Sequence, residues 1–304
     1  MKPSFAVIGC GRVGTALARH LAAAGYPAAG FFSRSRASAE RAAAIAGAPT
    51  LVHAEPRAAA EAAKIVFLTP PDHAIAETCQ LIADQRGFLE GSVVLHCSGA
   101  LSSNILEAAR YRGAFIGSMH PLQSFAAATK SSPFKGIKAA IEGDEAAVDC
   151  ARQLAEDLGA DPISIRTEGK TLYHAAAVVA SNYLVTLMRL SFKLLSEAGV
   201  PESEAYGVLS PLIGGTLNNI DQAGIPEALT GPIARGDVET VADHLSAIGQ
   251  ASRESADLYS RLGLATIEIA AARGSLSQAA ARQLHDMFSD MLAQCAPGEQ
   301  EPSR

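Results

Sequence analysis

The sequence Phe5-Ala6-Val7-Ile8-Gly9-Cys10-Gly11-Arg12-Val13-Gly14 decides the fold of the first half of the chain. A short apolar run ends in glycines spaced G-x-G-x-x-G, and an alanine-rich helical pattern follows. Between a strand and a helix, this spacing gives a tight turn at Gly9, bare backbone at Gly11 and close helix packing at Gly14. Free N–H groups at the helix N-terminus attract a negatively charged group. The stretch predicts a dinucleotide pyrophosphate site, with a purely structural turn as the alternative.

The composition indicates a well-packed globular protein of two domains. The chain has 304 residues, 48% of them hydrophobic and 18% charged. A net charge of -6 without a run of Lys or Arg argues against nucleic acid or an anionic membrane as a partner, so a small-molecule substrate is expected. No uninterrupted apolar run reaches the roughly 18 residues of a membrane span, and we expect no signal peptide.

The five cysteines are widely spaced and form no C-x-x-C pair. This pattern favours a reducing cytoplasm, and the histidine spacing predicts no metal site.

The pattern up to residue 166 predicts a doubly wound, mostly parallel sheet of about eight strands. Apolar runs expected as strands alternate with helical patterns, and Thr50–Val52 is expected to be a short third strand. The predicted second strand, Ala28–Phe32, ends in Ser33-Arg34-Ser35-Arg36, where an NAD-preferring protein usually has an acid. Guanidinium groups suit a 2′-phosphate, so NADP is preferred over NAD; the alternative is a solvated basic turn.

Further candidates follow the later strands, at the carboxyl edge of the sheet where such folds bind ligands. Thr69-Pro70 comes after Ile65–Leu68, and Asp72 is expected to cap the next helix. Ser98 follows the strand ending near His96, and His120 ends the next one. The alternatives are a serine that bonds its own turn and a histidine packed before Pro121. The predicted cofactor contacts are Gly9, Cys10, Gly11, Arg12, Val13, Gly14, Ser33, Arg34, Ser35, Thr69, Pro70 and Ser98.

From Thr167 onward, long helical patterns replace the strands. We therefore predict a dinucleotide-binding domain over residues 1–166, an all-α helical-bundle domain over 167–296 for substrate binding, and a disordered tail over 297–304. The first long helix, from about Lys170 to Ala198, is apolar nearly all round and is expected to be the buried axis of the bundle.

Polar side chains interrupt this apolar helix. His174, Ser181 and Asn182 fall near one face, either lining a cleft or forming a satisfied interhelical pair. Further along, Arg235 lies in a Gly-rich turn, where it either binds a substrate carboxylate or forms a surface ion pair.

In combination, these motifs resemble one family closely. They are the glycine loop, His96-Cys97-Ser98-Gly99-Ala100, His120-Pro121-Leu122-Gln123-Ser124-Phe125, Tyr173-His174 with Ala180-Ser181-Asn182, and Leu229-Thr230-Gly231-Pro232. The chain is similar to Rossmann-like oxidoreductases whose C-terminal half is the "domain of unknown function 2520", a family related to pyrroline-5-carboxylate reductase, deazaflavin-dependent NADP reductase and ketopantoate reductase. The resemblance implies NADP, an all-α second domain and a homodimer.

The resemblance also suggests roles for single residues. In the wider superfamily the first long helix carries a catalytic Lys with Asn residues one and two turns later, and His174, Val178 and Asn182 stand at those positions here. A histidine is a competent general acid near neutrality. We expect an NADP(H)-dependent oxidoreductase that reduces a small, ketopantoate-like 2-oxo or imino acid. His174, Asn182, Ser98 and His120 are the expected catalytic residues, and His120 and Arg235 are expected to hold the substrate carboxylate.

Two other functions fit the same motifs. One is a non-catalytic NADP-binding sensor or scaffold, which the missing Lys favours. The other is a prephenate-dehydrogenase-like oxidation, which the His120-Pro121 pair favours.

Overall fold

The computed structural model describes residues 1–123 and 132–295. It divides into two compact units, Met1–Asn182 and the part from Tyr183 onward. The division falls inside helix α7 (Lys170–Glu197), sixteen residues beyond the change in sequence pattern at residue 166. The first half of this helix therefore belongs with the sheet. The predicted tail, residues 297–304, and Ser124 lie outside the described residues.

The first unit contains one seven-stranded sheet in the order β2-β1-β3-β4-β5-β6-β7. All neighbouring strands are parallel except β5 and β6, which are antiparallel. The predicted doubly wound, mostly parallel sheet is thus confirmed. The strands are β1 Phe5–Ile8, β2 Ala28–Phe32, β3 Ile65–Leu68, β4 Val93–His96, β5 Phe115–Pro121, β6 Lys138–Gly143 and β7 Asp161–Ser164.

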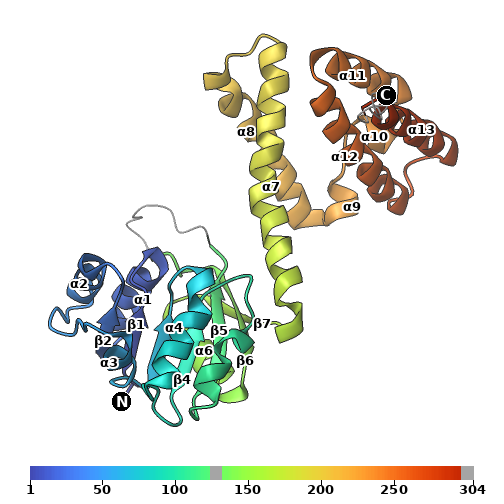
Figure 1. The fold of residues 1–304 in the computed structure, drawn as a ribbon. Coiled ribbons are helices and arrows are strands. Elements are labelled where there is room, and N and C mark those ends of the chain that lie inside the picture. The colour runs from blue at the N-terminus through green and yellow to red at the C-terminus, as the bar shows by residue number, and fades with distance from the viewer. Residues whose placement is uncertain (124–131, 296–304) are drawn as a thin grey trace, which may run out of the picture. The chain divides into compact units, whose positions relative to one another are not determined.

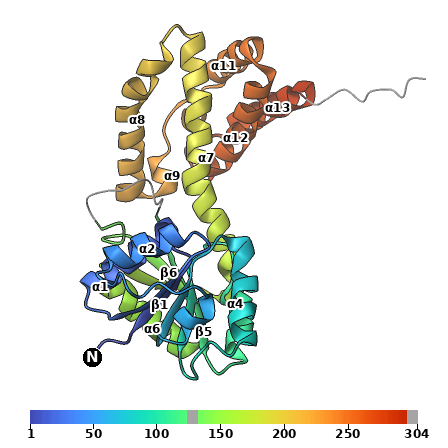
Figure 2. The ribbon, with the colours of Figure 1, turned by 60° about the vertical axis from the view of Figure 1, so that its left-hand side comes forward.

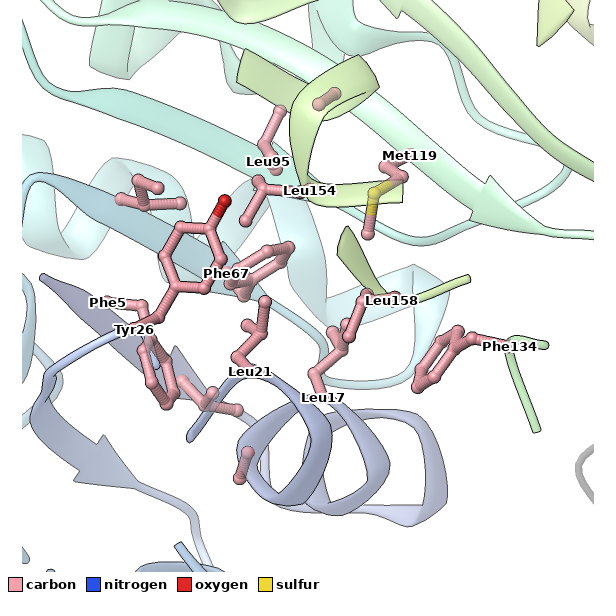
Figure 3. Packing of buried hydrophobic residues seen from close by; sticks show 14 of the residues in the cluster. Phe5, Leu17, Leu21, Tyr26, Phe67, Leu95, Met119, Phe134, Leu154 and Leu158 are labelled. Carbon is pink, nitrogen blue, oxygen red and sulfur yellow. The ribbon is translucent and has the colours of Figure 1, made fainter. Parts of the chain in front are cut away.

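Helices cover both faces of this sheet, which explains why its central strands read as continuous apolar runs (Figure 1). One face packs Phe5, Phe67 and Met119 against α1, whose Leu17 and Leu21 point into the cluster (Figure 3). Residues of α2 and α6 complete that face, and residues of α3 and α4 cover the other. The helices and short 3₁₀ turns of this unit are α1 Arg12–Ala23, α2 Arg36–Ile45, α3 Pro56–Ala60, η1 Asp72–Ala74, α4 Ile75–Asp84, η2 Ser103–Leu106, α5 Glu107–Arg110, α6 Glu145–Asp157 and η3 Thr167–Gly169.

The prediction of a third strand at Thr50–Val52 is wrong. Only an isolated parallel bridge joins Val52 to Phe31 of β2, so the sheet has seven strands rather than about eight. The segment occupies the place of the third strand beside β2, but Pro49 lacks an N–H group and only three residues follow it before the chain turns away. Three residues are too few to form a continuous series of backbone hydrogen bonds with β2.

The second unit is all helical, and helices α11, α12 and α13 lie side by side in it (Figure 2). Its core contains Val241, Leu245, Leu284 and Phe288. Besides the second half of α7, its helices are α8 Glu202–Ala223, α9 Ile225–Ala228, α10 Pro232–Arg235, α11 Val238–Ala251, α12 Arg253–Ala272 and α13 Gln278–Cys295. Helix α12 begins at Arg253 because Ser252 is extended and its hydroxyl accepts a hydrogen bond from the Ser255 N–H group.

The expectation that the first long helix is the buried axis of a bundle is wrong for this single chain. Lys170 is the only buried residue of α7, and Leu172, Val179 and Val185 are 77%, 57% and 70% exposed. Residues 167–197 are, by length and composition, the one described segment able to cross a membrane. One such helix is weak evidence for a membrane span.

Candidate active site

The glycine loop leaves β1 under tight backbone constraints. Gly9 has a φ of +104°, and a Cβ there would lie 2.4 Å from the Pro70 nitrogen. The Thr69 hydroxyl donates a 2.7 Å hydrogen bond to the Gly9 carbonyl. Thr69 and Pro70, which are predicted cofactor contacts, therefore lie in direct contact with the glycine loop.

Gly14 and Gly11 have different surroundings. A Cβ on Gly14 would lie 2.3 Å from the Gly9 oxygen, whereas a Cβ on Gly11 would meet nothing within 4 Å. Gly11 is also the N-cap of α1, where no side chain caps the helix and no acid lies in the first turn. The first N–H groups of α1 are therefore presented to an anion beside bare backbone.

The other predicted residues of this loop contribute in different ways. Cys10 is buried with its thiol 3.5 Å from the Phe32 carbonyl, and burial raises its pKa to about 11. Its side chain thus stays a neutral thiol, and only its backbone is available to a ligand. Val13 packs against the sheet core, and Arg12 is exposed.

The turn after β2 leaves its polar groups available. Arg34 and Ser35 are exposed, and Ser33 is half-buried. Ser35 is the N-cap of α2, but its hydroxyl makes no capping bond, while Arg36 forms an exposed ion pair with Glu40 at 2.9 Å. Arg34 makes no ion pair with an acid in residues 1–123 or 132–295. A guanidinium and two hydroxyl groups are therefore free to bind a phosphate.

The loop after β4 is held by a serine–carboxylate pair. The Ser98 hydroxyl donates a 2.7 Å hydrogen bond to Asp72 Oδ2 and accepts bonds from the Ala100 and Leu101 N–H groups at 3.2 and 3.1 Å. Asp72 was expected to cap a helix, and this is wrong because its carboxylate accepts the Ser98 hydroxyl instead. Ser98 thus bonds its own turn, as one sequence alternative held, and also fixes the loops after β3 and β4 to each other.

Two histidines converge above this loop. A Cβ on Gly99 would lie 2.7 Å from His174 Nδ1 and 2.8 Å from His120 Nε2, so both imidazoles meet at the space that this glycine leaves open. The Tyr173 hydroxyl lies 3.0 Å from His120 Nδ1. His174 Nδ1 is buried and has no hydrogen-bond partner among the described residues. A buried nitrogen without a partner is costly unless a ligand or water satisfies it.

Two histidines at this edge of the sheet, His96 and His120, are held neutral. Burial, followed by the charge of Lys170, lowers the pKa of His120 to about 4. The same two causes lower the pKa of His96 to about 3, and His96 Nδ1 accepts a bond from the Ser98 N–H group. At neutral pH these two imidazoles can therefore both donate and accept hydrogen bonds.

The other two predicted site residues belong to different parts of the chain. Asn182 is exposed and lies eight residues after His174, about 12 Å along the helix. Arg235 is exposed and belongs to the second unit. The first unit brings together His120, His174, Tyr173 and Ser98.

Four important residues were missed by the sequence reasoning as site residues: Asp72, Gly99, Glu142 and Lys170. Glu142 and Lys170 are far from each other in the sequence, and neither belongs to a motif that sequence analysis can recognise. Only Gly99 lay inside a motif that was singled out, His96–Ala100, where its spacing after a strand could have identified a close approach.

Comparison with known proteins agrees with this architecture. Residues 2–121 match the model of the Rossmann-like domain, and residues 137–266 match the model described as "Domain of unknown function (DUF2520)". Comparison with curated proteins gives no match.

Several solved structures resemble the chain along nearly its whole length. A Bacteroides fragilis protein provisionally described as an NADP oxidoreductase has 23% identity and a TM-score of 0.67, over 94% of this chain and 98% of that one. An imine reductase from Pseudomonas sp. has 20% identity and a TM-score of 0.60, over 94% and 100%. A reductive aminase from Aspergillus terreus, solved with NADPH, has 15% identity and a TM-score of 0.59, over 97% and 95%. At these identities the likeness demonstrates a shared fold.

Proposed function

We propose a function for this chain on the ground that it belongs to the family in which a Rossmann-like domain precedes a domain of unknown function DUF2520. The chain is an NADP(H)-dependent oxidoreductase that reduces a small 2-oxo or imino acid of the ketopantoate type. The observation that carries this proposal is the convergence of His120 and His174 on Gly99, at the sheet edge where the glycine loop also opens. The described NADP oxidoreductase and the NADPH-bound reductive aminase with the same fold support the cofactor.

The cofactor is held at two places in the first unit. The N–H groups that follow Gly11 bind the pyrophosphate, and Arg34 with its flanking serines binds the 2′-phosphate. NAD lacks that phosphate and binds less tightly. When bound, the nicotinamide supplies the hydride, and the protein supplies orientation and proton transfer.

The chemistry of the cluster suits proton donation to a forming alkoxide or amine. His174 donates the proton, since its Nδ1 has no described protein partner and lies against the open space at Gly99. Tyr173 and His120 form the neighbouring hydrogen-bonded pair that can replace that proton. His120 holds the substrate carboxylate, and Ser98, whose hydroxyl is bonded to Asp72 and to its own turn, fixes the loop at the cluster. The roles expected for Asn182 and Arg235 are not part of this proposal, because Asn182 lies about 12 Å along the helix from His174 and Arg235 belongs to the second unit.

We also propose that the chain works as a homodimer. Large exposed apolar patches commonly mark protein–protein contacts, and helices α7 and α8 each expose several large apolar side chains. Those on α8 are Tyr206, Val208, Leu212, Leu217 and Ile220, with exposed fractions from 40% to 68%. A second copy covers these faces, because the same self-complementary apolar surface is available on both partners. The free cysteines suit a cytoplasmic location, which stays a prediction.

Two alternatives remain testable. Prephenate-like oxidation is favoured by the position of His120 and Pro121 at the end of β5, beside the cluster. A non-catalytic NADP sensor is favoured by the absence of Lys at position 174.

An NADPH-oxidation assay against a panel of 2-oxo acids, imino acids and imines tests the proposal. We expect one class to be reduced, and we expect His174→Ala to lose at least tenfold in kcat/KM on the best compound. His285→Ala is the matched control, because His285 is exposed on α13 in the second unit. Reduction of no compound, or full activity of His174→Ala, would contradict the proposal; NADP⁺-dependent oxidation of prephenate would establish the first alternative.

A further inference from the structure

A buried ion pair lies beneath the histidine cluster. The side chains of Lys170 and Glu142 are each 1% exposed, and their charged atoms are 3.9 Å apart. Charges are rarely buried in this way unless their hydrogen bonds are satisfied. Glu142 accepts bonds from the Ser103 N–H group at 2.8 Å, the Ser103 hydroxyl at 2.6 Å and the Thr167 hydroxyl at 2.9 Å. Lys170 donates to the Ser118 hydroxyl.

These bonds fix the start of α7 against the end of β5. Lys170, Tyr173 and His174 are spaced i, i+3 and i+4, so they share one face of the helix. Ser118 and His120 are two residues apart and share one face of the strand. Two contacts therefore join the elements in register: Lys170 with Ser118, and Tyr173 with His120.

We propose that Lys170 is a positioning residue for the cluster. Its bond to Ser118 and its pairing with Glu142 set the register that brings Tyr173 and His174 to His120, and they build its ammonium group into the same site. The inference rests on the proposed function only in treating the cluster as the reacting site, because the placement and the charge effect are properties of the protein alone.

Several ionisable groups surround His120, and their effects oppose one another. Lys170 and His174 lower its pKa, Asp72 raises it, and burial has the largest effect. The groups facing it are Lys170, Tyr173 and His174 from α7, Asp72 from η1 and His96 from β4. Lys170 is thus a positively charged group whose removal changes the protonation of His120 without altering the imidazole.

The test is an NMR titration of ¹⁵N-labelled histidines in the full chain, without cofactor or substrate. In the wild type, we expect the His120 ring to stay neutral down to about pH 5. In Lys170→Met we expect its pKa to rise by about one unit, the order of magnitude for losing a charge several ångströms away in a partly buried site. Lys170→Arg restores the charge and is expected to keep the low value.

Two further variants make the outcome decisive. Lys138→Met, on the exposed face of β6 where Lys138 pairs with Asp161, is the matched control and should leave His120 unchanged. The double variant Lys170→Met with Glu142→Gln leaves no orphaned buried carboxylate, so it serves where the single variant unfolds; the same rise is expected. An unchanged His120 pKa in both Lys170→Met and the double variant, or an equal rise in Lys138→Met, overturns the inference. A failed NADPH-oxidation assay does not, because this titration requires no catalysis.

Discussion

Replacing Gly11 and Gly14 by alanine separates ligand binding from folding. Both glycines belong to the same G-x-G-x-x-G stretch, Gly11 as the N-cap of α1 and Gly14 in its first turn, and their surroundings are opposite. A Cβ on Gly14 would lie 2.3 Å from a backbone oxygen, about 1 Å short of an ordinary contact, and 2.7 Å from the Thr69 hydroxyl. A Cβ on Gly11 would meet nothing within 4 Å. Gly14→Ala should therefore destabilise the protein, and Gly11→Ala should not.

The magnitudes follow from the contacts. Overpacking against fixed backbone costs about 1–3 kcal/mol, of which the helix propensity of alanine recovers up to about 1 kcal/mol. The 2.3 Å approach to a backbone oxygen belongs to the upper part of that cost range, so after this recovery Gly14→Ala should lose about 1–2 kcal/mol, or about 2–8 °C in Tm for a unit of this size. Gly11 already has an extended backbone, with a φ of -74°, so alanine at this N-cap should cost less than about 1 kcal/mol.

The binding effects should run the other way. A methyl group on Gly11 occupies the space through which a pyrophosphate approaches the helix N-terminus, so we expect NADPH affinity to fall at least tenfold, or about 1.4 kcal/mol. Circular dichroism melts without ligand give the stability. The change in NADPH fluorescence on binding gives the affinity, and the absence of tryptophan removes one source of background. Equal loss of Tm in both variants, or undiminished NADPH affinity in Gly11→Ala, would refute the reasoning.

Three further outcomes are expected. Arg34→Ala should weaken NADPH binding roughly 10- to 100-fold, the range for lost charge-assisted hydrogen bonds, and should change NADH binding less than about twofold. Parallel titrations with the two cofactors measure both effects. Tighter binding of NADH than of NADPH by the wild type would contradict the 2′-phosphate site. Burial lowers the pKa of His96 to about 3 in the folded protein, against about 6.5 in the unfolded chain, so the unfolded chain binds more protons between these two pH values. The free energy of unfolding should therefore fall as pH falls through this window, by up to about 1.4 kcal/mol per pH unit for this group. Urea unfolding at several pH values should show a smaller loss of stability in His96→Asn. Val185→Glu or Leu212→Glu, at exposed apolar positions of α7 and α8, should convert a dimer into monomers in light scattering at unchanged helix content, and a monomeric wild type would contradict the dimer.

Much of the first unit could be predicted because local sequence determines it. The glycine spacing after Phe5–Ile8 and the apolar runs of the buried strands predict a doubly wound sheet, since strands covered on both faces must be apolar throughout. The short segment at Thr50–Val52 has the same apolar character but makes only one bridge. Its failure to form a strand depends on its neighbours and its length.

The long helix α7 shows that an apolar sequence pattern does not determine what covers the apolar residues. Its apolar residues were read as the axis of a bundle within one chain, but only Lys170 is buried in the structure. An apolar surface requires a partner, and its sequence does not say whether that partner belongs to the same chain.

The sequence by itself determined the strand–glycine–helix order, the basic turn at Arg34 and the presence of His120 and His174, because each depends on residues within a few positions of one another. The tertiary structure alone decided that these two histidines meet at Gly99, that Asp72 binds Ser98 rather than capping a helix, and that Lys170 is buried against Glu142. The physical reason is that such contacts join residues from separate strands and helices, and their distances are set by the docking of whole elements on the sheet.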